Sequence, residues 1–588
     1  MKHRGRVLLI CLLVFVVLAC LAVFVALYFT IWKVELEITA VQTDEDAQTI
    51  TVGWDTSRQV DKVVIEVSHD GDDVQSVTLS NMNQIRKGEY EVDAFYGRQT
   101  VKVSTSKGIY TATETTEVEL YADEYVIAPL TSTMPVTLFS LELEEITDGY
   151  TIPTFVWLKR ASAWNYKAMP ENVYTMPVGS ATELTKETDE KTIYAKTSEW
   201  IRELYEINPD SYFHLYYCDY FAYGWMDATI ASGIPAENYD VTLLSDGTAS
   251  FEAFNRHFNN ADSALNAAEY EKMKGEYETL KTQVAAGGSY TRNSKYVIDA
   301  GDLKEYAYVM AKEEPNVTWW LTRISGTLAT DNDEMYAEVE ALVDTSIFVK
   351  DLNTLLSALD ESQQASLKAL YNFSDEMFTE AAEEGKKIML ILGTWDVNED
   401  CFDDYVKAVM AYCGDDYVYY YKGHPKNPTY TVSGKLEHLE ELGLTDIDST
   451  IPAELILFFN PGVYVSGYQS TTFVSVDPEY AAFVFNCRMA DFDESLGYKD
   501  SMDGFISPVS SGDADYGCLV TDSSSYVLEF SSGTEIAIYS AKTGVLTYYT
   551  LQTDGTYSLD TEESVSGTEE GSYPADEDGL RADTSCEE

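Results

Sequence analysis

The stretch YDVTLLSDGTAS, residues 239–250, indicates the fold class of the central part of the chain. An apolar, strand-like run stops just before Asp246, which places a carboxylate where a buried strand gives way to a loop. Open α/β sheets bind their ligands at this end of their strands. Two later motifs repeat the arrangement, YYYKGHPKNP at 419–428 and VSGYQSTTF at 465–473. The ordered set of three predicts a ligand site built from strand ends.

Strand-like and helix-like stretches alternate around these motifs, which is typical of α/β folds with parallel sheets. The first series includes expected strands at 136–143 (VTLFSLEL) and 212–218 (YFHLYYC) and expected helices at 196–207 and 261–284. A second series begins at KKIMLILG, residues 386–393. We therefore expect two Rossmann-like lobes that face each other across a cleft.

The predicted organisation has six parts. They are a cytoplasmic tail with a membrane anchor, an all-β module, an N-terminal Rossmann-like lobe, a C-terminal Rossmann-like lobe, a β-rich segment and an acidic disordered tail. Their predicted limits, in chain order, are 1–32, 33–123, 124–385, 386–510, 511–560 and 561–588.

The N-terminal part contains one apolar run, Val7 to Trp32, which is longer than the roughly 20 residues that span a bilayer. Lys2, Arg4 and Arg6 precede the run, and an acidic flank follows it, so the positive-inside rule predicts a single-pass signal anchor with the rest of the chain outside the cytoplasm. A cleaved signal peptide is one alternative. A lipoprotein processed at Cys20 is another.

Residues 33–123 carry short alternating runs separated by turn residues, the pattern of an immunoglobulin- or fibronectin-type sandwich. Such a module either binds glycans or a partner, or serves as a stalk. The segment 511–560 returns to a β pattern, and the Glu-, Asp-, Ser- and Gly-rich residues 561–588 are typical of disorder.

The composition excludes some partners. Lys and Arg number 39 against 99 Asp and Glu, so the formal net charge is −60, which disfavours nucleic acid and anionic membrane surfaces. The eight cysteines form no CxxC pair and no zinc-type spacing with histidine. The Asp-Asp pairs at 403–404 and 415–416 lie on or beside an expected helix, so we expect neither a metal nor another cofactor.

The first motif offers a general base. Asp246 follows the strand-like run, and Gly247 and Thr248 form the turn after it, where glycine allows a substrate to approach closely. A carboxylate placed there can take a proton from a hydroxyl. Taken alone, the pair is more typical of an ordinary Asp-Gly turn.

The other motifs offer groups for a phosphate. His424 and Lys422 alternate along an extended chain, with Gly423 and Pro425 beside the histidine, and their positive or hydrogen-donating groups suit a departing phosphate. Ser470 and Thr471 are expected to open a helix, which is a good anion site. Alone, these motifs are more typical of a His-Pro turn and a helix cap.

Two further groups lie in the second lobe. Glu454 lies at an expected helix start, where it can accept hydrogen bonds from a base amino group or simply favour the helix dipole. Gly393, Thr394 and Trp395 end the first strand of the second lobe, and Trp395 is either a cap over a bound sugar or a partly buried core aromatic.

At these motifs, over roughly residues 137–485, the chain resembles the bacterial sialyltransferases of two-lobed GT-B fold. The resemblance implies Asp246 as general base, His424 acting on the phosphate of CMP-sialic acid, Glu454 at the cytidine and a mobile Trp395. It also implies an acceptor-side turn at Gly247-Thr248 and phosphate binding by Ser470-Thr471. Ser245 stands where the family has an acidic residue, and a Ser-Thr pair replaces its Ser-Ser pair.

The resulting hypothesis is an inverting, metal-independent transfer of sialic acid from CMP-sialic acid to a glycan hydroxyl by a membrane-anchored enzyme. Transfer of another sugar is a rival on the same fold. A non-catalytic surface protein that binds glycans through a degenerate transferase core is the rival of a different class. Because CMP-sialic acid is normally made inside cells, an outside location requires external donor, a reversed topology or a different activity.

Overall fold

The computed structural model describes most of the 588 residues, and structural statements below concern these residues. The described ranges are 2–27, 33–44, 48–69, 73–108, 110–147, 152–159, 164–170, 172–176, 190–219, 224–287, 306–322, 332–394, 399–425, 436–468, 470–474, 480–485, 517–522, 525–530, 535–540, 542–553, 556–559 and 572–574.

The chain divides into two compact units, each described by itself. Unit 1 contains Met1–Tyr125, Met176–Leu184 and Lys196–Tyr212, and unit 2 contains the rest. The sequence places a boundary near residue 123 but gives no sign that residues 196–212 group with the β module. The N-terminal helix α1 spans Lys2–Leu27.

The predicted membrane anchor is not confirmed. In the part of the chain that the structure describes, no helix is long and apolar enough to cross a membrane.

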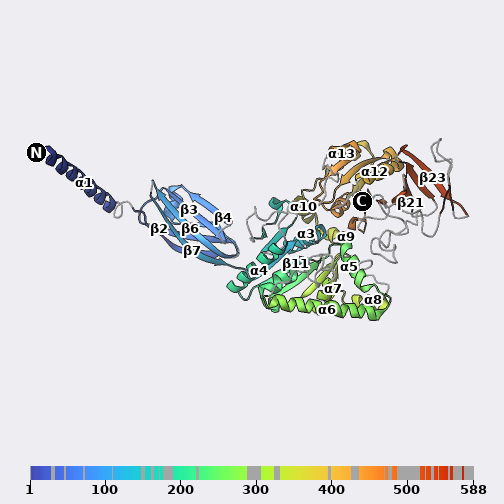
Figure 1. Cartoon of the computed structure of the whole chain (residues 1–588), viewed down its shortest axis with the longest axis horizontal. Coiled ribbons are helices and arrows are strands. Elements are labelled where there is room, and N and C mark those ends of the chain that lie inside the picture. The colour runs from blue at the N-terminus through green and yellow to red at the C-terminus, as the bar shows by residue number, and fades with distance from the viewer. Residues whose placement is uncertain are drawn as a thin grey trace. The chain divides into compact units, whose positions relative to one another are not determined.

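Unit 1 is built mainly from seven antiparallel strands, blue in Figure 1, in two sheets of order β1-β2-β5 and β4-β3-β6-β7. Alternate residues of β3, namely Val63, Ile65 and Val67, are buried, as expected for a strand with one face against a core. The region is therefore mainly β, as its sequence pattern predicts, although it also contains the short helix α2; its assignment to the immunoglobulin or fibronectin type stays a prediction. The bounds are β1 Leu36–Asp44, β2 Thr49–Thr56, β3 Lys62–His69, β4 Asp73–Leu79, α2 Met82–Lys87, β5 Glu89–Asp93, β6 Gly97–Lys107 and β7 Tyr110–Leu120.

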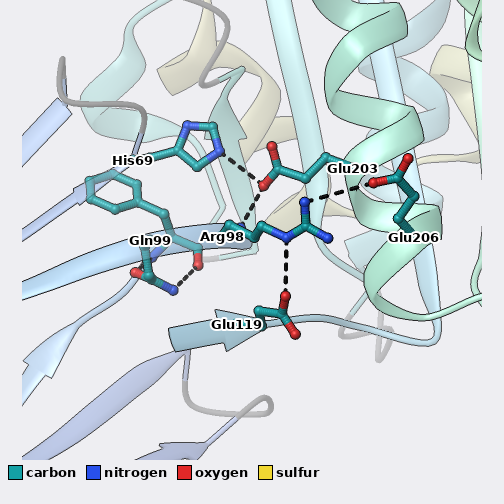
Figure 2. A network of polar contacts seen from close by, with 7 residues as sticks. His69, Arg98, Gln99, Glu119, Glu203 and Glu206 are labelled. Carbon is teal, nitrogen blue, oxygen red and sulfur yellow. Dashed lines mark hydrogen bonds and ion pairs between the residues drawn. The ribbon is translucent and has the colours of Figure 1, made fainter. Parts of the chain in front are cut away.

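A polar network joins the β strands of unit 1 to helix α4, Glu190–Ile207, whose second half belongs to this unit. Figure 2 shows Glu203 between His69 and Arg98. The Glu203 Oε1 atom accepts a hydrogen bond of 2.5 Å from the backbone N–H of Arg98 and lies 3.5 Å from Nε2 of the buried His69. The Arg98 side chain reaches Glu119 at 3.1 Å and Glu206 at 3.7 Å, and both of these pairs are exposed.

Unit 2 contains two sheets with parallel cores. The first has the order β10-β9-β8-β11-β12-β13-β14, and the second begins β17-β16-β15-β18-β19-β20. All the strand pairs whose register is known in these two series are parallel. This confirms a mixed α/β fold with parallel sheets. The strands are β8 Glu124–Leu130, β9 Thr154–Leu158, β10 Val173–Thr175, β11 Tyr212–Cys218, β12 Tyr239–Leu244, β13 Val317–Leu321, β14 Ile347–Val349, β15 Lys387–Leu392, β16 Tyr417–Lys422, β17 Thr445–Ile447, β18 Val463–Tyr468, β19 Ala481–Phe485 and β20 Gly517–Asp522.

Helices accompany these strands, among them α6 and α7, drawn in green in Figure 1. Besides the first residues of α4, up to Ala195, unit 2 contains α3 Thr133–Thr147, α5 Thr248–Phe258, α6 Ser263–Ala285, α7 Tyr306–Glu313, α8 Asp333–Glu340, α9 Leu352–Ala358, α10 Glu361–Leu370, α11 Thr379–Glu384, α12 Glu399–Cys413, α13 Leu436–Glu441 and α14 Ala453–Phe459.

The strand predicted over residues 136–143 is wrong, because this stretch lies inside helix α3. Most side chains from Leu138 to Leu143 are buried, and the apolar ones pack in one core with the first sheet. A helix buried on most sides is apolar without periodicity, and a short apolar run of this kind does not distinguish helix from strand. The strand that the prediction missed is β8, directly before the helix.

The second sheet continues past residue 510 instead of ending there. Strands β20 to β25 are joined by antiparallel pairing and extend the same sheet. The last strand lies within the predicted disordered tail, so that tail is not wholly irregular; its other residues lie outside the described ranges. The added strands are β21 Ser525–Phe530, β22 Glu535–Ser540, β23 Val545–Leu551, β24 Thr556–Leu559 and β25 Ser572–Pro574.

We predict that Glu203→Ala destabilises β6 of unit 1 by about 1–3 kcal/mol, because the Arg98 N–H loses its acceptor and the buried His69 loses its anionic neighbour. Hydrogen exchange of the β6 amides in the full chain measures the effect. Glu206→Ala is the matched control, and its exposed pair with Arg98 predicts a change below about 1 kcal/mol. Equal effects of the two changes would contradict the prediction.

Candidate functional site

The strand order creates a switch point in each sheet of unit 2. In the first sheet the chain proceeds outward from β8 to β10 on one side and from β11 to β14 on the other, so the switch lies between β8 and β11. In the second sheet the switch lies between β15 and β18. Open α/β sheets bind ligands outside the carboxyl ends of strands at such points. The residues that follow β11, β12, β15, β16 and β18 are therefore the candidates.

Asp246 lies between β12 and helix α5, at the carboxyl end of its strand. Its backbone N–H donates to Oδ1 of Asp219 at 2.9 Å and lies 3.1 Å from Oγ of Ser250. Gly247 has a φ of 74°, a conformation that favours glycine, and its N–H donates to Oγ of Ser245 at 3.1 Å. The predicted Asp-Gly turn thus exists, and the Asp246 side chain is half-buried at its tip.

The sequence analysis did not single out Asp219, whose carboxyl group accepts hydrogen bonds from this turn and from the helix that follows it. It directly follows β11 and is fully buried. Its Oδ2 atom accepts hydrogen bonds from Ser250 Oγ at 2.5 Å and from Trp319 Nε1 at 3.1 Å. Burial raises the pKa of Asp219 to about 7, and the nearby charge of Asp246 adds to that rise, while the hydrogen bond from Ser250 opposes it.

A signal for Asp219 exists in the sequence. The run YFHLYYC is followed at once by this aspartate, which is the same strand-then-carboxylate pattern that drew attention to Asp246. Strands β11 and β12 are paired in parallel, so that Cys218 lies opposite Leu244 and both carboxylates emerge at one edge.

At the second sheet, Lys422 and His424 lie at and just past the end of β16. The Lys422 side chain is buried, and its Nζ donates to the carbonyl of Ser449 at 3.2 Å. His424 and Pro425 are half-buried. Burial also raises the pKa of Asp446, on the neighbouring β17, to about 6, with the charge of Asp448 adding and that of Lys422 opposing. One buried cation therefore lies among carboxylates beside the predicted phosphate position.

A second set of polar side chains joins β18 to α14. Glu454 is buried in the first turn of α14, and its Oε1 accepts a hydrogen bond from Thr472 Oγ1 at 3.1 Å. The Thr472 hydroxyl lies 3.0 Å from that of Ser470. The residues from Thr471 to Val474 form a short 3₁₀ helix, as the motif predicts a helical turn there. Ser470 is thus linked to Glu454 through Thr472.

Two glycines permit close backbone approach at the second switch point. Gly467, in β18, has a φ of 135°, and a Cβ added there would collide with the backbone of Leu392 at the end of β15. A Cβ added at Gly393 would collide with the hydroxyl of Tyr421. The Gly393 N–H also donates to the carbonyl of Lys422 at 3.0 Å, so the ends of β15 and β16 are tied together.

The predicted residues thus gather in two sets on different sheets. The first combines Asp246 and Gly247 with the newly found Asp219, and the second contains Glu454 and Ser470. Trp395 lies outside the described residues, and the side chains of Thr248 and Thr471 are not described. Within the described ranges, no group of three or more His, Cys, Asp or Glu residues is arranged to hold a metal ion.

The two sets suit complementary chemistry. A half-buried carboxylate at a tight turn can remove a proton from a hydroxyl. Hydroxyls at the start of a helical turn can bind an anion, and a buried glutamate beside them can accept hydrogen bonds from a nucleobase. Helix α14 connects them in part, since Leu455, next to Glu454, is buried in the same cluster as Leu244 at the end of β12.

No protein-family model matches the chain, and none of the curated proteins matches it. Among solved structures, it is similar to a sialyltransferase from Photobacterium damsela, with 13% identity, a TM-score of 0.46, and coverage of 79% of this chain and 94% of the other. It is similar to an alpha/beta-galactoside alpha-2,3-sialyltransferase from Photobacterium phosphoreum, with 12% identity, a TM-score of 0.46 and coverage of 64% and 94%.

A third similar structure is a 2,6-sialyltransferase from Photobacterium sp. JT-ISH-224, solved with the donor product CMP and the acceptor substrate lactose. It has 12% identity and a TM-score of 0.46, with coverage of 79% of this chain and 90% of the other. At TM-scores of 0.46 and identities of 12–13%, the function has to be argued from the residues of the site.

We predict that Gly467→Ala destabilises unit 2 by more than about 3 kcal/mol, because it adds a backbone collision to a strained φ. Gly462→Ala is the matched control, since its φ of 95° is also unfavourable but nothing lies within 4 Å of the added Cβ. Calorimetric unfolding of the full chain compares the two, and a Tm loss no larger for Gly467→Ala than for Gly462→Ala would show that the close approach is absent.

The raised pKa of Asp219 predicts a pH dependence of stability. The folded state favours the neutral carboxyl, so the stability that Asp219 contributes is fully present below its ordinary pKa of 3.8 and is lost as the pH rises through about 7. Relative to Asp219→Asn, which does not titrate, the wild type should lose unfolding free energy between about pH 4 and pH 7 and little above that range. Urea unfolding at several pH values measures this difference, and a difference that is constant with pH would contradict the prediction.

Proposed function

We propose that the chain is an inverting glycosyltransferase that moves sialic acid from CMP-sialic acid to a glycan hydroxyl without a metal. The observation that supports this most is the placement of its two polar sets. A carboxylate on a tight turn lies at the strand ends of one parallel sheet, and a Glu-Thr-Ser set lies at the strand ends of the other. The order of the three sequence motifs, and their resemblance to bacterial sialyltransferases, point to the same reaction.

In the proposed reaction, Asp246 takes the proton of the acceptor hydroxyl as the oxygen attacks the anomeric carbon of sialic acid. The bond from that carbon to the phosphate oxygen breaks, and CMP leaves with the electron pair. The proton ends on the Asp246 carboxylate. Asp246 is half-buried, and the turn is formed by Gly247 with a φ of 74°, where the missing side chain allows a substrate to approach the backbone.

The donor side is assigned to the second sheet. Ser470, with Thr472 behind it, faces the phosphate in this proposal, and His424 donates a hydrogen bond to the phosphate as negative charge develops there. Glu454 accepts hydrogen bonds from the amino group of cytosine. Lys422 contributes a buried positive charge at the end of β16. Trp395 and Thr471 keep the donor-side roles that the resemblance implies.

The test is transfer by the purified full-length protein, given CMP-sialic acid and lactose in the presence of a chelator. We predict product from the wild type and a fall of about 10²–10⁴-fold in kcat for Asp246→Asn, because a general base contributes about that much. Binding of CMP, measured by calorimetry, should be unchanged in the variant.

Asp240→Asn is the matched control, since it makes the same chemical change on the same strand β12. Asp240 lies at the other end of that strand, where it pairs with His214 at 2.8 Å. Equal loss in both variants would contradict the role of Asp246. A wild type that neither forms product nor binds CMP would overturn the proposed function in favour of a non-catalytic glycan-binding protein.

A further inference from the structure

The buried carboxylate of Asp219 has no role in the proposed reaction so far. We propose that Asp219 is a positioning residue for the base: it fixes the backbone of Asp246 and closes a directed hydrogen-bond chain beneath the turn. This inference rests on the proposed function for its kinetic consequence, but its structural consequence is independent of any activity.

The two carboxyl oxygens of Asp219 accept hydrogen bonds from different donors. Oδ1 accepts the backbone N–H of Asp246, and Oδ2 accepts the hydroxyl of Ser250 and the indole N–H of Trp319. These donors come from the turn, the first turn of α5 and strand β13. The carboxylate therefore ties three elements together at the end of β11, in a place fully shielded from water.

The hydrogen bonds beneath the turn run in one direction. The Gly247 N–H donates to Ser245 Oγ, the Ser245 hydroxyl donates to Ser250 Oγ, and the Ser250 hydroxyl donates to Asp219. A carboxylate only accepts hydrogen bonds, so it is the group that fits the end of such a chain. Hydrogen bonds arranged head to tail polarise and strengthen one another. These hydrogen bonds hold both residues of the turn. Asp246 binds Asp219 directly, and Gly247 is linked to it through Ser245 and Ser250.

This arrangement gives Ser245 a role that its position in the motif does not suggest. It stands where the resembled family has an acidic residue, and here its hydroxyl relays the Gly247 N–H toward a carboxylate supplied by another strand. The acidic group beneath the turn is thus provided by Asp219, 27 residues earlier, as Asp246 bonds to it across that separation.

A purely structural role and a positioning role predict different measurements. If Asp219 only stabilised the fold, its replacement would lower the free energy of unfolding and leave the kinetics of folded protein unchanged. If it positions the base, kcat falls while the acceptor KM and the CMP affinity stay the same, because the lost interaction acts in the transition state. The pH profile of kcat also shifts, because a neighbouring negative charge favours the protonated form of a carboxyl group.

The single variant Asp219→Asn is hard to interpret, because it brings two hydrogen-bond donors together. Its amide oxygen can still accept from Asp246, but its NH₂ group then faces the indole N–H of Trp319, so two donors meet in a buried place. Trp319→Phe removes the second donor. The informative comparison is therefore the double variant Asp219→Asn/Trp319→Phe against Trp319→Phe alone, in the full chain.

We predict that the double variant folds and binds CMP like its single-variant reference, while kcat falls at least about tenfold and its pH profile shifts. An unchanged kcat with an unchanged pH profile would overturn the inference. A fall in kcat that is matched by an equal rise in KM, with the same pH profile, would also count against it.

A second variant, Asp219→Ala, tests the placement without any assay of transfer. Removal of the acceptor should speed hydrogen exchange in the segment 244–250 by at least about tenfold, because the turn loses its anchor. If the wild type shows no transfer but this exchange increases, the proposed function fails while the anchoring of the turn stands. Unchanged exchange would overturn the anchoring itself.

Discussion

The organisation of the carboxyl ends of the first sheet's strands depends on one buried carboxyl group, that of Asp219. A carboxylate that is fully removed from water is unfavourable unless it is hydrogen-bonded, and Asp219 receives three donors. Those donors fix the turn after β12, the start of α5 and the middle of β13 in relation to one another. The backbone N–H of the half-buried Asp246 is thus held by the buried Asp219.

The carboxyl ends of the second sheet's strands depend on close backbone approach and not on a buried carboxyl group. Gly467 lets β18 pass directly against the end of β15, and Gly393 makes room for the hydroxyl of Tyr421. These contacts hold the ends of β15, β16 and β18 together. Beyond β18, Ser470 is linked through Thr472 to Glu454 by hydrogen bonds. Parallel pairing thus places chemically distinct groups at one end of each sheet, as expected at topological switch points.

Much of this arrangement follows from periodicity. The alternation of strands and helices predicts parallel sheets, and apolar runs that end in polar motifs predict which loops carry the site. What the pattern misses is set by tertiary packing. The apolar run of α3 is buried on most sides and so lacks the helical period, and the pairing of β25 with β24 forms a strand in a segment whose composition is typical of disorder.

The site itself shows the same limit. Asp246, Gly247 and Glu454 are found from local sequence because each is a distinct residue at a strand or helix end. Asp219 also follows a strand-like run, but the sequence does not show its hydrogen-bond partners, which come from the turn after β12, from α5 and from β13. The relay from Ser470 runs through Thr472 to Glu454, and spacing alone does not identify which of two adjacent threonines takes part.

In the proposed reaction, the polar groups at the carboxyl ends of the two sheets act together. A crystal structure of the full chain with CMP and lactose is the direct test. We expect the CMP phosphate within hydrogen-bond distance of Ser470, the cytosine beside Glu454, and a lactose hydroxyl within hydrogen-bond distance of the Asp246 carboxylate. CMP bound away from α14 and β18, or lactose bound away from the turn at Asp246, would contradict it.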